Sequence, residues 1–279
     1  VHALMGENGS GKSTLVKLLS GVHRPDGGRV LIGQSPLRAA GPRAAAAAGV
    51  ATVFQEVQCV PGQPVLDNLW LGADGMLRRA SSAGGTGTSD SRGVSGRRER
   101  AREVLDELLG DCPDALLSAP AGSLSLSERQ AVAIGRALLR SPKVLILDEA
   151  TSALDVATRD RLFTAVRRLT AAGGAVLFIS HRMDEVTEIA DRVTVLRSGE
   201  SVATLDRAEA TLDRLVALMT GGEQLVPPEA AHSSTGAEAV TSGAGEPGGV
   251  VLAAGGLTLR AGEIVGLAGL EGQGQDEYL

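Results

Sequence analysis

Aromatic side chains are scarce in this sequence, at 2% of the 279 residues, so stacking platforms for single-stranded nucleic acid are not expected. Basic residues are also outnumbered, with 27 Lys and Arg against 33 Asp and Glu and a formal net charge of -6. A nucleic-acid-binding domain usually carries a basic surplus or a basic face. The composition therefore argues against a nucleic-acid partner.

Cysteine and long apolar runs are scarce as well. Cys59 and Cys112 are the two cysteines, and their separation excludes a disulfide scaffold or a zinc ribbon and fits a reducing compartment. The longest apolar stretch, residues 44–53, is too short to cross a bilayer, and no charged-then-apolar signal segment opens the chain. We expect any membrane role to come through a partner.

Hydrophobic residues nevertheless make up 43% of the chain, enough for a sizeable core. The strand-like apolar runs are residues 1–5, 50–54, 144–147, 175–179 and 193–196. Helical patterns lie at residues 15–20, 158–170 and 183–190. Strands that alternate with helices predict an α/β fold with a mostly parallel sheet covered by helices on both faces.

The middle of the chain departs from this alternation. Residues 84–96 are rich in Gly, Ser and Thr and predict a flexible surface loop, and helical patterns flank it at residues 97–109 and 127–140. We therefore expect a helical subdomain, at about residues 70–140, inserted into the α/β core. The arginines of residues 97–102 are interspersed with acidic residues, which favours a solvated helix face over a binding patch.

A glycine-rich motif stands between the first predicted strand and the first helical pattern. Its residues are Gly6, Glu7, Asn8, Gly9, Ser10, Gly11, Lys12 and Ser13, which match the phosphate-binding pattern G-x-x-x-x-G-K-[ST]. The glycines let successive N–H groups point at phosphate oxygens, and the helix adds the positive end of its dipole. Lys12 can reach the β- and γ-phosphates and Ser13 can hold Mg²⁺. The flanking strand and helix favour this interpretation over a merely structural turn.

Two acidic residues, Asp148 and Glu149, end the apolar run at residues 144–147. Asp148 is placed to bind Mg²⁺, directly or through water, and Glu149 to polarise an attacking water. By themselves the two acids fit the cap of a loop equally well. Together with the phosphate-binding motif they favour catalysis.

A third motif, Leu124, Ser125, Leu126, Ser127 and Glu128, precedes the helical pattern at residues 127–140. As local structure it is an ordinary helix N-terminus, with Ser125 or Ser127 able to act as the N-cap. Its position before the acidic pair gives it a second interpretation.

With these three elements, the chain resembles the ATP-binding cassette (ABC) ATPases as far as about Gly221. The resemblance implies a P-loop NTPase core with an inserted helical subdomain, and it implies ATP and Mg²⁺ as ligands. Gln55 matches the Q-loop of the family, and His181 matches its switch histidine. The D-loop is matched by Ser152, Ala153, Leu154 and Asp155. The third motif matches the signature loop, which in the family faces the ATP held by the opposite cassette.

The same resemblance implies a role for each site residue. Lys12 and the phosphate-binding loop hold the phosphates, with Thr14 a candidate contact for the α-phosphate. Mg²⁺ and water are arranged by Ser13, Asp148 and Gln55. Glu149 acts as the base, and His181 stabilises charge on the γ-phosphate.

Residues 178–186 and 189–197 look like those of the carbohydrate-importer class of ABC ATPases, in which two cassettes are fused in one polypeptide. This implies membrane permease subunits as partners, an extracytoplasmic solute-binding protein as an indirect partner, and a peripheral location on the cytoplasmic face of the cell membrane. A nucleoside importer remains an alternative. So do a soluble ABC ATPase of ribosomes or DNA, and an inactive remnant. The segment 221–249 carries four Glu and no Lys or Arg, which disfavours a ribosome-associated member.

The end of the chain is similar to its own beginning. Gly269, Gly272 and Gly274 repeat the spacing of the glycines in the phosphate-binding loop. We therefore expect a first ABC ATPase domain at residues 1–221 without its N-terminal strands, a linker at 222–249, and the truncated start of a second domain at 250–279. Cassette–cassette pairing would then take place within the full-length protein. Because the opposite signature loop is missing, we expect this chain alone to hydrolyse ATP near background.

The two nucleotide sites of such a pair are expected to differ. Gln275 and Asp276 stand in the second copy where Lys12 and Ser13 stand in the first, so a cation is lost and an anion gained. The signature loop of the first copy lacks both glycines that the family commonly has. These departures predict one hydrolytic site and one weak or silent site.

Overall fold

A computed structural model describes residues 1–37, 41–72, 91–220, 250–254 and 257–260. The chain divides into two units, Val1–Leu225 and Val226–Leu279. The second unit contributes one antiparallel strand pair, β9 (Val250–Ala254) with β10 (Leu257–Arg260). Its glycine repeat and the residues Gln275 and Asp276 lie outside the described residues.

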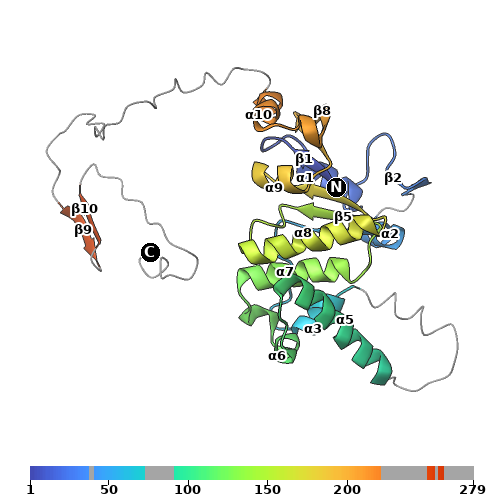
Figure 1. Ribbon diagram of the computed structural model, residues 1–279, viewed down its shortest axis with the longest axis vertical. Helices are drawn as coiled ribbons and strands as arrows, with labels where there is room; N and C mark the ends of the chain where they lie inside the picture. The colour runs from blue at the N-terminus through green and yellow to red at the C-terminus, as the bar shows by residue number, and fades with distance from the viewer. Residues whose placement is uncertain (38–40, 73–90, 221–249, 255–256, 261–279) are drawn as a thin grey trace. The chain divides into compact units, whose positions relative to one another are not determined.

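A six-stranded sheet forms the centre of the first unit (Figure 1). Its strands are β1 (His2–Met5), β4 (Val50–Val53), β5 (Val144–Asp148), β6 (Ala175–Ile179), β7 (Arg192–Arg197) and β8 (Glu200–Asp206). Their order is β4-β5-β6-β1-β7-β8, and every neighbouring pair is parallel except β7 with β8. The predicted α/β fold with a mostly parallel sheet is confirmed.

The last strand, β8, was not expected from the sequence. It pairs antiparallel with β7 across a two-residue turn in which Ser198 and Gly199 have φ of 50° and 83°. Positive φ at both turn residues is the geometry that suits a tight hairpin. β8 lies at the edge of the sheet and is largely exposed, so it lacks the apolar run that revealed the other strands.

Helices cover both faces of the sheet because alternate strand residues point to opposite sides. Leu145 and Leu147 face a core shared with α7 (Leu126–Leu138), α8 (Val156–Ala171) and α9 (Met183–Ile189). Ile146 faces the other core, which it shares with α1 (Lys12–Leu19) and α2 (Pro42–Ala48). The remaining elements of the first unit include a hairpin of β2 (Leu31–Ile32) with β3 (Ser35–Pro36), and α10 (Leu212–Thr220).

Within the described residues between β4 and β5, four α-helices build a core of their own. They are α3 (Val65–Trp70), α5 (Ser91–Leu109), α6 (Asp114–Ser118) and α7. Fully buried residues from each meet there, namely Leu69, Leu105, Leu117 and Val132. Since α7 contributes to this core and to the core under the sheet, it joins the inserted helices to the α/β body.

The prediction of a loop at residues 84–96 is wrong for residues 91–96. α5 begins at Ser91, so residues 91–96 are helical despite two glycines, and residues 84–90 lie outside the described residues. Helix propagation costs less than nucleation, so the strong pattern at residues 97–109 extends backward through a weak segment.

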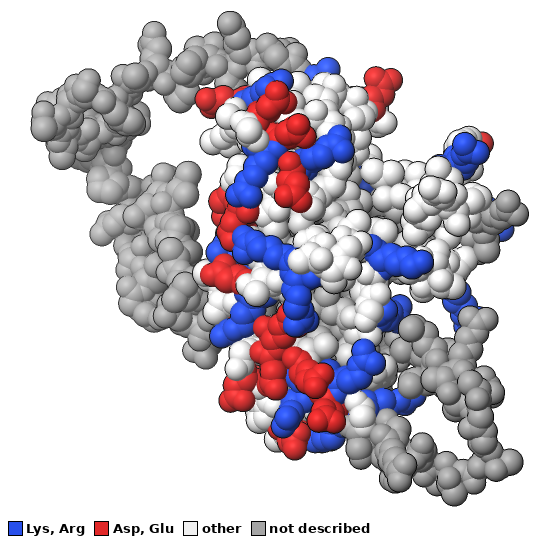
Figure 2. All heavy atoms as spheres, turned by 45° about the vertical axis from the view of Figure 1, so that its right-hand side comes forward, with Lys and Arg blue, Asp and Glu red and all other residues white. Residues whose placement is uncertain are grey.

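Arg97 and Arg98 of α5 contact neighbouring helices. Arg98 donates to the Asp114 backbone oxygen at 2.7 Å, and the Arg97 guanidinium lies 5.6 Å from the centre of the Trp70 ring. On the face shown in Figure 2, basic and acidic side chains are interspersed. This agrees with a solvated helix face that also makes local ion pairs.

Cys112 lies in the core of the inserted helices, and its thiol is predicted to be unreactive. The residue is 3% exposed, and burial together with Asp106, Asp111 and Asp114 raises the pKa of the thiol to about 11. At about pH 8 roughly one part in a thousand would be thiolate, the reactive form. We expect N-ethylmaleimide to modify half-buried Cys59 first, and Cys112 about tenfold more slowly.

Intact-mass measurement on the Cys59→Ser and Cys112→Ser variants checks this expectation. The native Cys59→Ser variant should gain its single adduct only slowly, and both variants should react at similar rates in denaturant. Equal rates in the native state would contradict the burial of Cys112.

Candidate active site

The phosphate-binding loop connects β1 to α1, as its pattern predicts. Gly6 is required by close packing, because a Cβ there would lie 2.4 Å from the Leu196 carbonyl oxygen and 2.5 Å from Ser10 Oγ. Gly11 is the N-cap of α1 at φ 102°, and no side chain caps the helix. The first amide groups of α1 are therefore left for another acceptor, and an anion is the ligand that such a helix start prefers.

Lys12 folds back over this loop. Its Nζ donates to the carbonyl oxygens of Gly6 at 2.6 Å and Glu7 at 2.9 Å. Ser10 Oγ is buried without a hydrogen-bond partner among the described residues, and the Ser10 carbonyl accepts from the Gly199 N–H at 3.0 Å. The loop thus has a cation, Lys12, held by two hydrogen bonds, and a buried hydroxyl, Ser10, without a partner among the described residues. A hydrogen bond from Gly199 in the β7–β8 turn stabilises the loop. These features fit a phosphate group.

Asp148 and Glu149 stand where β5 ends, at the edge of the sheet that also carries the phosphate-binding loop. Burial raises the pKa of Asp148, and the neighbouring Glu149 charge raises it further, whereas Lys12 and Lys17 lower it. The influence of Lys12 reflects the convergence of the loop and the strand end. Mg²⁺ prefers oxygen ligands. The Asp148 carboxylate and the Ser13 hydroxyl at the start of α1 can supply them.

Glu149 and His181 come together from neighbouring strand ends. Glu149 Oε2 lies 3.4 Å from His181 Nδ1. The Glu149 backbone has φ of 49°, an uncommon conformation for a residue with a side chain, and its N–H donates to the Ile179 carbonyl at 2.9 Å. The sequence suggested both residues separately, and the structure adds their direct contact.

Gln55 follows β4 and lies at a groove rather than against the phosphate-binding loop. It lines this groove with Glu56, Leu126, Ser152 and Ala153, so the Q-loop match, the signature helix and the D-loop match meet there. Among the described residues, no hydrogen bond or ion pair joins Gln55 to Lys12 or Asp148.

Ser125 is the N-cap of α7, as the local interpretation of the third motif predicted. The Glu128 N–H donates to Ser125 Oγ at 3.2 Å, and Glu128 Oε2 accepts from the Ser125 N–H and hydroxyl, each at 2.8 Å. This is a complete capping box. The start of α7 therefore satisfies its own polar groups and carries a carboxylate.

The contacts between α7 and the D-loop match were not predicted from the sequence. Ser127 Oγ donates to Asp155 Oδ2 at 2.7 Å and accepts from the Asp155 N–H at 3.2 Å. Buried Gln130 donates to the Ala150 carbonyl at 3.0 Å. Glu185, which is fully buried in α9, was also missed. A polar residue inside an apolar helical pattern indicates a buried hydrogen bond. The pattern alone does not identify the residue to which it bonds.

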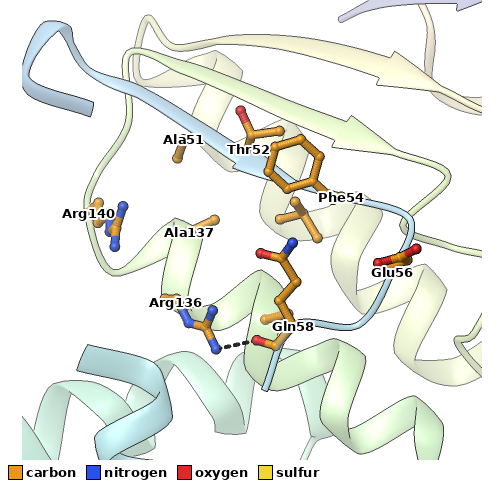
Figure 3. A pocket seen from close by; sticks show the side chains of 10 residues that line it. Ala51, Thr52, Phe54, Glu56, Gln58, Arg136, Ala137 and Arg140 are labelled. Carbon is orange, nitrogen blue, oxygen red and sulfur yellow. Dashed lines mark hydrogen bonds between the residues drawn. The ribbon is translucent and has the colours of Figure 1, made fainter. Parts of the chain in front are cut away.

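A second hollow, shown in Figure 3, lies between β4 and α7. Arg136 donates to the Gln58 carbonyl at 2.7 Å there, drawn as a dashed line, and burial lowers the pKa of Arg136. No residue of the phosphate-binding loop lines it. The hollow is therefore a surface separate from the phosphate-binding motif.

No helix within the described residues is both long and apolar enough to span a membrane. They also contain no group of three or more His, Cys, Asp or Glu side chains placed to hold a metal. Asp148 and Ser13 instead combine one carboxylate with a hydroxyl.

The chain is similar in sequence to proteins named as ribose import ATP-binding proteins. The ribose import ATP-binding protein RbsA 1 of Rhizobium johnstonii is 39% identical over 283 residues, which cover 100% of this chain and 52% of that protein. RbsA 1 of Burkholderia thailandensis is 41% identical over 285 residues, covering 99% of this chain and 52% of that protein. The chain thus spans about half the length of these relatives.

Solved structures share the fold. The ADP conformation of MJ1267, an ATP-binding cassette of an ABC transporter, has a TM-score of 0.62 at 27% identity and covers 79% of this chain and 87% of its own. The dimeric post-hydrolysis state of the ATP-binding cassette MJ0796 has a TM-score of 0.62 at 23% identity, covering 74% and 84%. Residues 1–152 match the family described as ABC transporter. The chain therefore belongs to the ABC transporter family.

Proposed function

We propose that this chain is the ATP-hydrolysing cassette of an importer for a monosaccharide. The observation that carries the proposal is the meeting of Lys12, Asp148 and the Glu149–His181 pair at one edge of the sheet. A phosphate-binding loop, a metal-binding carboxylate and a base beside a histidine are the parts that hydrolysis of a nucleoside triphosphate needs.

Each residue has a distinct task in the proposed reaction. Lys12 and the amide groups at the start of α1 hold the phosphates, with Thr14 at the same helix start. Ser13 and Asp148, assisted by Gln55, hold Mg²⁺, which neutralises charge on the phosphate oxygens when bound. Glu149 takes a proton from the attacking water. Catalysis is then mainly positioning and electrostatic stabilisation.

His181 acts on the γ-phosphate in this scheme, and its contact with Glu149 fixes where its ring lies. Since Nδ1 faces the Glu149 carboxylate, Nε2 is the nitrogen left to donate to an oxygen of the phosphate. In this scheme the same contact orients the Glu149 carboxylate, which is the proposed base. The histidine thereby links charge stabilisation to the orientation of the base.

Transport is the part of the proposal that rests on the relatives. RbsA proteins are named for ribose import, so we assign this chain to the same class of solute without choosing the sugar. Permease subunits would dock on the groove beside Gln55 and on the hollow of Figure 3, at the junction of the inserted helices with the sheet. A solute-binding protein would act indirectly, with the cassette peripheral to the cytoplasmic face of the membrane.

We extend the proposal to the organisation of the full-length protein. Residues 1–221 form a first cassette, 222–249 a linker, and 250–279 the start of a second cassette that pairs with the first. The capping box supports unequal sites, because Glu128 places a carboxylate where the signature loop would face a phosphate. In the second copy, Gln275 and Asp276 remove the cation and add a further anion. One site hydrolyses ATP, and the other is weak or silent.

Purification of the full-length protein from detergent-solubilised membranes tests the transport proposal. We expect mass spectrometry of the tagged protein to identify a multi-span permease, with or without a secreted binding protein. Ribosomal proteins, or a soluble protein with no membrane partner, would refute the importer and leave the ATPase. An untagged strain processed in parallel is the control for non-specific membrane proteins.

A further inference from the structure

Glu185 is a fully buried carboxylate that the proposed reaction does not use. It lies in the first turn of α9 with 0% exposure. Burial of an ionised carboxylate is unfavourable unless hydrogen bonds and an opposite charge compensate it. The groups that compensate Glu185 therefore indicate what this side chain does.

Two hydroxyl groups donate to the same oxygen of Glu185. Thr151 Oγ1 lies 2.6 Å and Ser180 Oγ 3.0 Å from Glu185 Oε2. Both donors are themselves buried, at 1% and 3% exposure. The other oxygen, Oε1, lies 3.2 Å from Arg182 Nη1, an ion-pair distance whose direction does not make a hydrogen bond.

The two donors belong to the loops that carry the proposed catalytic pair. Thr151 follows Glu149 by two residues after β5, and Ser180 immediately precedes His181 after β6. Ser180 Oγ also accepts from the Arg182 N–H at 3.0 Å, which fixes the backbone on the other side of His181. Glu185 thus binds residues close in the chain to Glu149 and His181, and among the described residues no hydrogen bond joins it to either of them.

The loop at Glu149 has particular need of such support. Glu149 has φ of 49°, and its carbonyl accepts from the Ser152 hydroxyl at 2.8 Å and the Ser152 N–H at 3.2 Å. A residue in an uncommon backbone conformation keeps it only where surrounding contacts over-determine it. The Thr151–Glu185 bond holds this turn from its buried side.

We infer that Glu185 is a positioning residue that joins the loops of Glu149 and His181, so that the two side chains keep the separation observed in the structure. The inference rests on the proposed ATPase function. The simpler role for Glu185, an acidic residue in the first turn that stabilises the dipole of α9, predicts an effect on stability alone.

Substitution of Glu185 in the full-length protein separates these roles. Glu185→Met removes the acceptor at similar volume, and we expect kcat for ATP hydrolysis to fall about tenfold while KM for ATP stays within about twofold. Glu185→Gln keeps an oxygen that both hydroxyls can reach, so it should restore kcat to within about threefold of the unsubstituted protein. Rescue by the amide is the result that a dipole role would not give.

Asp184→Asn is the matched control. Asp184 is the adjacent acid in the same turn, is exposed, and pairs with the same guanidinium at 3.6 Å. We expect kcat unchanged in this variant. If Glu185→Met does not fold, Thr151→Val and Ser180→Ala each remove one donor with little change in volume, and each should lower kcat at unchanged ATP affinity.

The outcomes distinguish this inference from the proposed function. Normal hydrolysis by Glu185→Met, or equal losses of kcat in the Met and Gln variants, would overturn the positioning role and leave the ATPase intact. Hydrolysis at background by the unsubstituted protein, unchanged in Glu149→Gln, would overturn both. A thermal midpoint that falls with no change in kcat would assign Glu185 to stability alone.

Discussion

Replacing Glu149 with Gln in the full-length protein is expected to lower steady-state ATP hydrolysis by about 10²- to 10³-fold, the usual contribution of a general base. The amide has nearly the same shape as the carboxylate but cannot take a proton from water. It also loses the charge that faces His181 Nδ1. ATP affinity should be retained, because the phosphate-binding loop is unaltered.

The effect of Glu149→Gln on Asp148 also predicts slower hydrolysis without weaker nucleotide binding. The Glu149 charge is one of the causes that raise the pKa of Asp148, so its removal lowers that pKa toward the ordinary range. Asp148 then ionises at least as readily as before, and Mg²⁺ binding should not weaken. Hydrolysis is measured as phosphate release, and affinity by equilibrium nucleotide binding in the presence of Mg²⁺.

Glu200→Gln is a suitable control for the Glu149 substitution. Glu200 is an exposed glutamate at the start of β8, and the same change of group there should leave hydrolysis unaltered. A Glu149→Gln protein that kept a large share of the activity would show that a second site hydrolyses ATP. The proposal of one hydrolytic and one silent site would then be wrong.

The second large effect is expected at Lys12. We expect Lys12→Ala to weaken ATP binding by about 100-fold, because it removes the cation that would make a charge-assisted hydrogen bond to the phosphates. It also leaves the Gly6 and Glu7 carbonyls without the ammonium donor that now holds them at 2.6 Å and 2.9 Å. The loop loses both its cation and part of its internal support.

Lys17→Ala separates phosphate contact from a general effect of charge. Lys17 lies in the last turn of α1 and, like Lys12, lowers the pKa of Asp148. Each substitution therefore raises the Asp148 pKa further, but only Lys12 contacts the loop. Titration of a fluorescent ATP analogue should show a large change for Lys12→Ala and little for Lys17→Ala. Equal losses in both variants would contradict a specific role of Lys12.

The phosphate-binding loop could be predicted because its information is local. Gly6, Gly11 and Lys12 are needed by backbone geometry and by phosphate chemistry at fixed spacing, so the pattern can be recognised in a single sequence. The acidic pair after β5 is local as well, since a buried parallel strand is a nearly continuous apolar run. The phosphate-binding loop and the acidic pair, which are most of the candidate site, could therefore be predicted from the sequence.

Contacts between distant segments could not be predicted in this way. The bonds of Ser127 with Asp155 and of Glu185 with Thr151 and Ser180 join elements that meet only in the folded chain. α2 was missed for a different reason: its run of alanines has helical propensity but no amphipathic period. In α5 the glycines concealed a helix that its neighbours impose.

The central position of β1 has a consequence for how the protein is made. β1 pairs in parallel with β6 and β7, so this strand finds its partners only after residues 175–197 have been synthesised. The loop that follows β1 gains its support from Gly199 later still. At about 5–20 residues per second, a nascent chain would wait roughly 10 to 40 seconds before its nucleotide-binding loop could close. The proposed nucleotide-binding loop is therefore expected to reach its folded form only once nearly all of the first unit has been synthesised.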